Sequence, residues 1–351
     1  MRSATKVKSP APDALQYPHA HVPAPAAMHD VAHGVCWLRM PLPFELDHIN
    51  LWLLADGAGW TIVDCGFGGD HTRDLWRRIF ASHLQGRPVK RIIVTHFHPD
   101  HFGLAAWLAA EWQAPVFMTE PEFASAQAWY AAREPFTREA HIAMFRQHGL
   151  NFAAGDPPLP RETLFRRGVP DIPAQIVPLI DGQVLQINGR AWRVICGYGH
   201  SPEHAALYCD ALGVLIAGDM VLPRISTNVS VQPHRPEADP LGLFLDSLTR
   251  YVECDAGTLV LPSHGRPFYG ARERVQQLHQ HHAARLDELQ RAFDEPRTAA
   301  EAMRVLFKRP LDTQQTLFAM GETLSHLNYL RHRGQLKRES GADGIYRFAR
   351  S

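Results

Sequence analysis

The segment RIIVTHFHPDHFG, residues 91–103, constrains the fold more than any other part of the chain. Its β-branched residues predict a short buried strand over 89–95. The strand is followed at once by four potential metal ligands: His96, His98, Asp100 and His101. Crowding so many polar groups at a strand end gives no packing benefit, and neutral imidazole and carboxylate groups bind divalent metals well. The segment therefore predicts part of a metal site.

Three further predicted strands end in a residue of the same kind. WRVICGYG leads to His200, GVLIAG to Asp219 and GTLVLPS to His264. In α/β sheets, binding groups gather at the carboxyl ends of strands, so these side chains are expected to meet at one rim. A lone histidine such as His264 is more often an ordinary loop residue, and its interpretation depends on the cluster at 96–101. Asp219 has two carboxylate oxygens and can bridge two cations.

The order of predicted elements indicates a layered α/β fold. Strands and helices alternate over the first third of the chain. A helical insert is expected at 120–152, more strands up to about 268, and helices again from 271. We therefore expect a Pro- and Ala-rich disordered tail at 1–30, a main domain at 31–270 and a small C-terminal domain at 271–351.

Composition excludes some classes of function. Lys plus Arg and Asp plus Glu are 36 each, which makes nucleic-acid binding an unfavoured expectation. The sequence has no apolar run of transmembrane length and no apolar centre of a signal peptide, so no membrane association is expected. The five cysteines are scattered without a C-x-x-C pair, which is typical of a reduced cytoplasmic protein.

THFHPDHFG resembles the T-H-x-H-x-D-H signature of the metallo-β-lactamase superfamily, and further motifs follow in family order over about 33–270. Asp64 in TIVDCGFG matches an aspartate that supports the site without binding metal. The resemblance implies an αββα sandwich with a dinuclear site at its edge. One metal would be held by His96, His98 and His200; the other by Asp100, His101 and His264; Asp219 would be shared. The implied cofactors are two divalent ions, zinc first, with iron or manganese as alternatives.

The resemblance also implies hydrolysis by a metal-bridging hydroxide, with Asp100 as a proton carrier. It is nearest to the glyoxalase II-like and thioesterase-like branch, but GHSPEH has Glu203 where those relatives have glycine. Candidate substrate contacts are Glu203, Arg224 and Asn228. Residues 271–351 resemble the small helical or winged-helix-like domain that follows the sandwich in some relatives.

The leading hypothesis is a hydrolase that cleaves a small acyl ester or thioester, as an acyl thioesterase or lactonase does. One alternative is a persulfide dioxygenase-like oxidoreductase, with a single iron at His96, His200 and Asp219. Another is an RNA-processing hydrolase, to which the basic segment LRHRGQLKRE (330–339) would contribute. A non-catalytic binding protein is disfavoured by the complete set of ligands. A homodimer is a further expectation.

Overall fold

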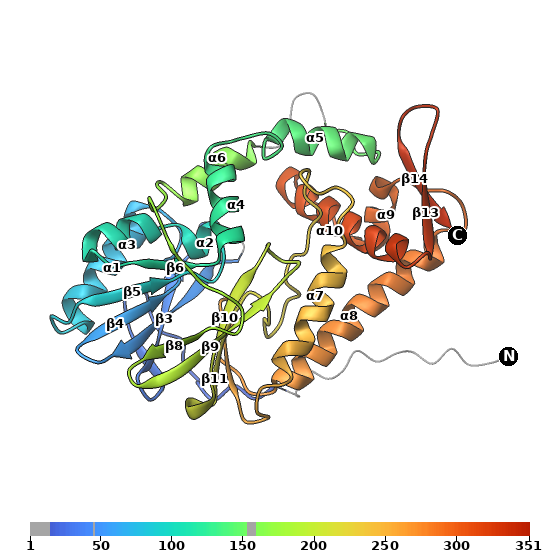
Figure 1. The fold of residues 1–351 in the computed structure, drawn as a ribbon. Helices are drawn as coiled ribbons and strands as arrows, with labels where there is room; N and C mark the ends of the chain where they lie inside the picture. Colours follow the sequence, from blue (N-terminus) through green and yellow to red (C-terminus); the bar gives the residue numbers. More distant parts are fainter. Residues whose placement is uncertain (1–14, 45, 153–158) are drawn as a thin grey trace.

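The fold is a sandwich of two sheets with helices on both outer faces, seen in a computed structural model that describes residues 15–44, 46–152 and 159–351 (Figure 1). The larger sheet has the order β1-β2-β3-β4-β5-β6-β7, antiparallel up to β4 and parallel from there. Its strands are β1 (His29–Ala32), β2 (Val35–Pro41), β3 (His48–Asp56), β4 (Gly59–Val63), β5 (Val89–Ile93), β6 (Val116–Met118) and β7 (Val177–Pro178).

The smaller sheet has the order β12-β11-β10-β9-β8, and only the β11–β12 pair is parallel. Its strands are β8 (Val184–Ile187), β9 (Arg190–Gly197), β10 (His204–Cys209), β11 (Val214–Gly218) and β12 (Leu259–Pro262). A short 3-10 turn, η2 (Asp210–Leu212), joins β10 to β11.

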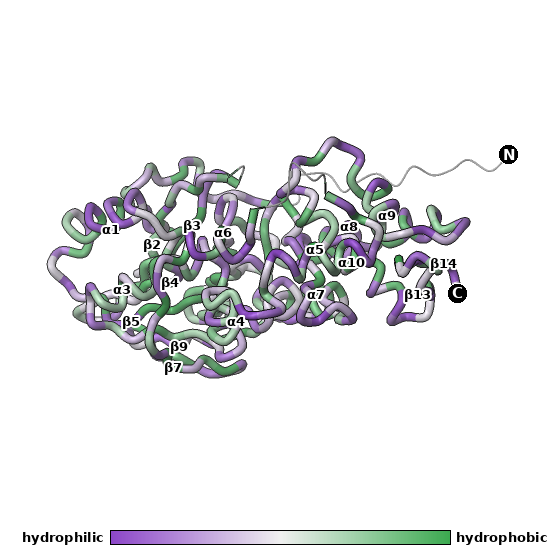
Figure 2. The backbone as a smooth tube through the Cα atoms, turned by 90° about the horizontal axis from the view of Figure 1, so that it is seen from above, coloured by the Kyte–Doolittle hydropathy of each residue, from purple (hydrophilic) through white to green (hydrophobic). Residues whose placement is uncertain are grey.

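Successive apolar residues of the strands face the other sheet and the outer helices in turn, and their packing joins the layers. On β2 and β3, Trp37 and Trp52 face the other sheet and stack with ring centroids 6.3 Å apart. Their neighbours Leu38 and Leu51 belong to the core beneath the helices of the larger sheet. Successive side chains of a strand point to opposite faces, so strands buried on both faces become apolar throughout. In Figure 2 hydrophobic stretches lie among the strands of the sandwich, whereas α1 alternates between hydrophilic and hydrophobic residues.

The helices cover the two outer faces, which confirms the αββα expectation. They are α1 (Asp70–His83), α2 (Pro99–Phe102), α3 (Ala105–Trp112), α4 (Glu120–Tyr130), α5 (Arg138–Gln147), α6 (Arg161–Gly168) and α7 (Pro240–Leu248), followed by the 3-10 turn η3 (Thr249–Tyr251). Helices α1, α3 and α4 share a core with the larger sheet, and α7 shares one with the smaller sheet. No helix of the described residues is both long and apolar enough to cross a bilayer.

The C-terminal segment is a helical unit with a β-hairpin. It comprises α8 (Ala271–Ala292), α9 (Ala299–Leu306), α10 (Thr313–His332), β13 (Leu336–Ser340) and β14 (Tyr346–Arg350). Arg297 forms an isolated β-bridge with Phe348 on β14. Capping boxes at Thr298 and Asp312 begin α9 and α10.

Two expectations about chain organisation need correction. Within the predicted disordered tail, residues 15–30 are placed against the sandwich, and residues 1–14 lie outside the described part. Leu15 is buried, and Gln16 exchanges backbone hydrogen bonds of 3.2 and 2.8 Å with Tyr269. The helical insert also continues beyond 152, because α6 packs on α4. Composition alone misled the first prediction, since Pro and Ala are also compatible with an extended segment on a core.

Candidate metal centre

All seven predicted ligands lie where strands of the two sheets end. His96 follows β5, and His98 is the N-cap residue of α2, which carries Asp100 and His101. His200 follows β9, Asp219 follows β11 and His264 follows β12. The backbone before Asp219 requires glycine: Gly218 has φ +53°, and a Cβ there would lie 2.1 Å from His204 Nε2.

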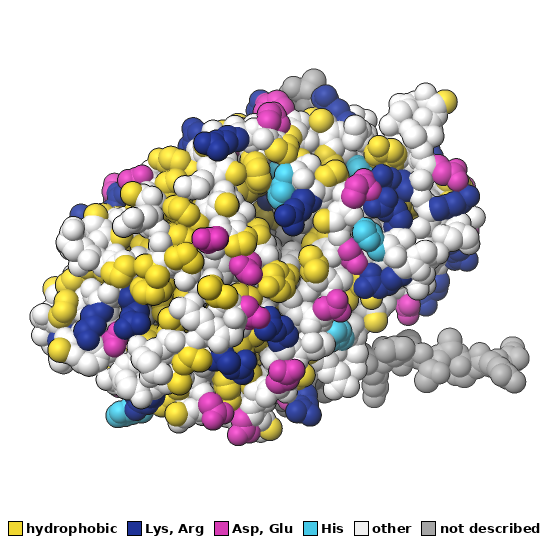
Figure 3. Space-filling model, viewed as in Figure 1, with side chains coloured by type: hydrophobic (Ala, Val, Ile, Leu, Met, Phe, Trp, Pro, Cys, Tyr) yellow, Lys and Arg dark blue, Asp and Glu magenta, His cyan; other side chains and the backbone are white. Residues whose placement is uncertain are grey.

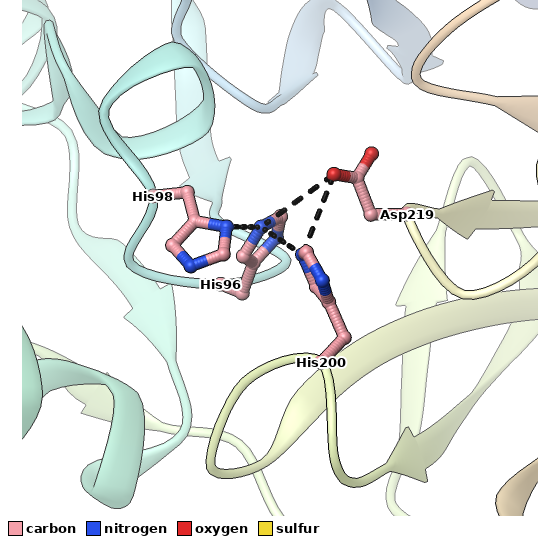
Figure 4. A group of neighbouring side chains, drawn as sticks. All are labelled: His96, His98, His200 and Asp219. Atoms are coloured by element: carbon pink, nitrogen blue, oxygen red, sulfur yellow. Dashed lines mark hydrogen bonds and ion pairs between the residues drawn. The ribbon is translucent and has the colours of Figure 1, made fainter. Parts of the chain in front are cut away.

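Four of these side chains form a first group (Figure 4). His96 Nε2 lies 2.9 Å from His98 Nδ1 and 3.2 Å from His200 Nε2. Asp219 Oδ2 lies 3.4 Å from His200 Nε2 and 4.0 Å from His96 Nε2. One ligand atom from each residue falls within 4.8 Å of the others, which is a spacing that a single ion can span.

Asp100, His101 and His264 form a second group beside the first. Asp100 Oδ2 lies 3.6 Å from His101 Nε2 and 3.4 Å from His264 Nε2. The other oxygen of Asp219, Oδ1, faces this group at 3.5 Å from His101 Nε2 and 3.4 Å from His264 Nε2. The two oxygens of Asp219 thus point to two different groups.

Unpaired buried atoms show that this donor set fits divalent metal ions. His101 Nε2, His264 Nε2 and Asp219 Oδ1 are buried and have no hydrogen-bond partner among the described residues. A buried polar atom without a partner costs about 1–3 kcal/mol. Imidazole nitrogen and carboxylate oxygen are donors for zinc and similar ions, so a bound cation would satisfy all three atoms. The fold and this His/Asp cluster indicate divalent metals.

Asp64 and Thr95 orient the rings from the far side. Asp64 Oδ2 lies 2.8 Å from His101 Nδ1, and Asp64 Oδ1 accepts a 2.8 Å bond from the Thr95 backbone N–H. Thr95 Oγ1 donates to the same carboxylate and lies 3.1 Å from His96 Nδ1. Asp64 is buried with φ 64°, and the supporting role that the resemblance implies for it stays a prediction. Such partners fix the orientation of a ligating imidazole.

Backbone carbonyls orient the remaining rings. His200 Nδ1 donates to Asn228 O at 2.8 Å, and His264 Nδ1 donates to His48 O at 2.7 Å. Both bonds leave Nε2 free to face the centre, as a ligand requires.

The charges of the two groups differ. Burial, together with neighbouring histidines, lowers the pKa of His96 and of His98 well below the usual value, so both are neutral donors. Burial also acts against charge on His264, but the carboxylates of Asp219 and Asp100 outweigh it and raise the pKa of His264 to about 10. The same excess of negative charge favours a cation at this position.

Sequence reasoning missed Glu122, which braces the centre from α4. Its fully buried carboxylate accepts hydrogen bonds from Ser201 Oγ at 2.6 Å, Glu203 N at 2.6 Å and Phe97 N at 3.0 Å. These donors flank His98 on one loop and His200 on the other. Burial raises the pKa of Glu122, against the effect of the three hydrogen bonds.

Asn50 is a second missed residue. Its side-chain amide donates to Pro262 O at 2.8 Å and Gly265 O at 2.9 Å, which fixes the turn around His264. No local pattern marks a polar residue within an apolar strand as a brace for a turn more than 200 positions away.

The predicted substrate contacts lie in different settings. Glu203 accepts a 3.3 Å hydrogen bond from Tyr198 OH, and its φ is not positive, so the backbone there does not need glycine. Asn228 orients His200 through its carbonyl, while its side chain donates to Glu322 of α10 at 3.4 Å. Arg224 is exposed on the same loop. Contact of these residues with a substrate stays a prediction.

A two-sheet sandwich with a His/Asp cluster at its strand ends defines a metal-dependent hydrolase. The family model for the metallo-beta-lactamase superfamily matches residues 45–264, and the model for a metallo-beta-lactamase-like C-terminal domain matches residues 286–351. The chain belongs to the metallo-beta-lactamase superfamily.

Individual relatives agree with this assignment. A probable metallo-hydrolase, YqjP, of Bacillus subtilis is 25% identical over 301 residues, covering 84% of this chain and 91% of the relative. An atrochrysone carboxyl ACP thioesterase of Aspergillus fumigatus is 24% identical, covering 68% of this chain and 57% of the relative. Among solved structures, a beta-lactamase domain protein from Burkholderia ambifaria is 48% identical with a TM-score of 0.90, covering 97% of this chain and 99% of that one. A metallo-beta-lactamase family protein from Thermus thermophilus is 34% identical with a TM-score of 0.78, covering 92% and 100%.

Proposed function

We propose that the protein is a dinuclear hydrolase that cleaves an ester or thioester, of the acyl thioesterase or lactonase type. The observation that carries the proposal is the division of Asp219, whose Oδ2 faces His96 and His200 while Oδ1 faces His101 and His264. A carboxylate placed in this way suits two cations held side by side. We propose zinc as the ion in both groups.

When bound, two such ions supply an activated water and polarise the carbonyl of the substrate. The chain's own residues hold the ions and orient the reacting groups. His96, His98 and His200 converge in the first group, and Asp219 adds charge between the two groups. Asp100 is ionised, because His101 and His264 outweigh the effect of burial and lower the pKa of Asp100 to about 2. We propose that Asp100 accepts a proton as the tetrahedral intermediate forms and delivers it to the leaving group.

The thioester assignment is supported by the thioesterase among the relatives, which covers much of this chain. The single-iron alternative needs only the first group, and the completeness of the second group favours the dinuclear proposal. An RNA substrate is disfavoured because basic side chains of the C-terminal segment are already paired. Arg331 and Arg338 each contact one carboxylate oxygen of Glu237, and Arg333 contacts the carboxylate of Asp239 at 2.7 Å.

Metal content and turnover test the proposal together. Elemental mass spectrometry of the purified protein should find about two zinc ions per chain, on the two-metal pattern. A panel of small esters, thioesters and lactones should show cleavage that chelation abolishes. One iron per chain, no cleavage and thiol-dependent oxygen uptake would replace this proposal with the dioxygenase alternative.

A cytoplasmic location and a homodimer stay predictions. The location is supported by the five cysteines, which are all free and buried.

A further inference from the structure

Helix α6 connects the metal centre to the C-terminal segment. Its C-terminal end packs on α2, which carries Asp100: a Cβ at Gly168 would lie 2.6 Å from Pro99 Cβ. Its N-terminal residue, Arg161, lies beside Phe318 of α10, with the guanidinium carbon 5.3 Å from the ring centroid. Figure 3 shows a shallow hollow near the middle of this face, with basic and histidine side chains close to it.

Arg161 is a crowded cation without an anionic partner. Its guanidinium lies between two aromatic rings, 5.5 Å from the Trp129 centroid and 5.3 Å from that of Phe318. The side chain keeps partial exposure, yet enough protein surrounds it that burial lowers the pKa of Arg161 to about 10. Within the described ranges, no carboxylate pairs with it and no hydrogen bond uses its fork of N–H groups.

The neighbouring histidines do not compensate this charge. Arg161 lowers the pKa of His141, after the larger effect of burial, and His234 acts in the same direction. Arg161 is also the first residue of α6, and Pro160 at the N-cap offers no side-chain acceptor to the helix. Free N–H groups at a helix start add positive potential at the same place. Glu162 in the first turn of α6 adds one carboxylate, but its Oε2 accepts a hydrogen bond from the Arg138 backbone N–H. The guanidinium of Arg161 itself therefore keeps no anionic partner among the described residues.

A row of aromatic rings leads from Arg161 to the metal centre. Trp129 stacks on Phe165 with centroids 6.3 Å apart, and Phe165 lies 6.1 Å from Phe97. Phe97 in turn lies 4.8 Å from His98. With a rise of 1.5 Å per residue, α6 separates Arg161 from the end that packs on α2 by about 10 Å. An apolar ligand body would have to be at least this long to join the centre to Arg161.

We propose that Arg161 binds an anionic group, a carboxylate or a phosphate, at the end of the substrate remote from the bond that is cleaved. The proposal rests on the proposed function and adds a substrate class to it: acyl esters or thioesters with an apolar body and an anionic end. A planar guanidinium can hold either anion with two parallel hydrogen bonds, and the two rings fix its plane. The competing explanation is that Arg161 only joins the insert to α10 through its ring contacts.

Binding of uncleavable ligands tests the proposal independently of turnover. Three thioethers, in which an S-alkyl group replaces the S-acyl group, serve as probes. The first has a neutral alkyl chain on N-acetylcysteamine, the second the same chain with a terminal carboxylate, and the third the neutral chain on coenzyme A, which supplies phosphates. Isothermal titration calorimetry gives Kd for the full-length wild type, Arg161→Gln and the matched control Arg167→Gln, which removes an exposed charge from the same helix.

We expect one anionic thioether to bind the wild type at least about tenfold more tightly than the neutral one, as a charge-assisted contact allows. Arg161→Gln should abolish that preference, and Arg167→Gln should keep it. The carboxylate and coenzyme A probes identify which anion is bound. A wild type without preference, or equal weakening of all three ligands in Arg161→Gln, would overturn the proposal in favour of the purely structural role. Failure of the proposed function would appear separately, as absence of turnover in an enzyme that still discriminates the anionic ligand.

Discussion

Replacing Glu122 by glutamine tests whether the two histidine-bearing loops are held by one buried carboxylate. Oε1 of Glu122 accepts hydrogen bonds from Ser201 Oγ and Glu203 N, and Oε2 accepts one from Phe97 N. Glutamine keeps the shape but offers a single acceptor oxygen. If that oxygen takes the place of Oε1, the amide of Phe97 loses its acceptor and meets an N–H donor instead.

The size of the effect follows from these contacts. A buried donor without a partner costs about 1–3 kcal/mol. In Glu122→Gln the backbone N–H of Phe97 would also face the new amide N–H, so the cost should lie in the upper half of that range. We therefore expect the free energy of unfolding to fall by about 2–3 kcal/mol. Disturbing groups that orient metal ligands weakens metal binding about 10–100-fold. Because Glu122 contacts residues adjacent to the ligands and not the rings themselves, we expect about tenfold.

Two measurements separate these effects. Urea unfolding of the metal-free protein reports the free energy of unfolding, and competition with a chromophoric chelator reports metal affinity. Glu120→Gln is the matched control, because Glu120 is exposed at the start of the same helix. If Glu122→Gln matches Glu120→Gln in both measurements, the hydrogen bonds to Glu122 do not hold the loops and the reasoning is wrong.

Three further changes probe the centre and its surroundings. Asp219→Ala should lower the bound metal from about two ions to less than one, because both groups lose an oxygen, and elemental mass spectrometry checks this against about one ion in His264→Ala. Asp100→Asn keeps a ligating oxygen but cannot accept a proton, so the variant should retain both ions and lose kcat by at least about tenfold. Full turnover with both ions bound would rule out proton transfer by Asp100. Burial raises the pKa of Glu322 from 4.5 to about 7, so the stability linked to its protonation is complete below pH 4.5 and is lost as pH rises through 7. Glu322→Gln should therefore gain stability relative to the wild type between pH 5 and pH 8 in urea unfolding, and an equal difference at both pH values would contradict this.

The sequence predicted that the candidate ligands come together because four of them follow strands. His96, His200, Asp219 and His264 needed only a buried run followed by a donor, and the carboxyl ends of strands in one layered fold meet at a rim. Asp64 came from the resemblance, and the structure places it on His101. These features are local or belong to a motif, so a single sequence carries them.

The braces of the site were not predictable in this way. Glu122 lies 79 positions from Ser201 and 81 from Glu203, and two of its three bonds end on backbone N–H groups, which have no sequence signature. Helix α6 was hidden for a related reason: it has only 8 residues, follows a Pro-rich stretch and buries little besides Phe165. Short helices depend on tertiary contacts for their stability, so a periodic pattern was not there to find.

The C-terminal segment is part of the site's support and not a separate appendage. One apolar core contains Ile195 and Leu215 of the smaller sheet, Phe244 of α7, and Met320 and Leu327 of α10. The predicted boundary at 270–271 therefore crosses a shared core, and cutting there would expose apolar residues on both sides.

The same segment reaches the loop that orients His200. Glu322 accepts from the Asn228 side chain, and His282 lies 3.2 Å from Ser226 Oγ on that loop. The carbonyl of Asn228 in turn holds the His200 ring. The C-terminal segment therefore supports the loop that orients His200 and, through Phe318, packs beside Arg161. Substitutions in this segment are expected to alter metal affinity and ligand preference even where the substituted residue contacts neither the metal ligands nor Arg161.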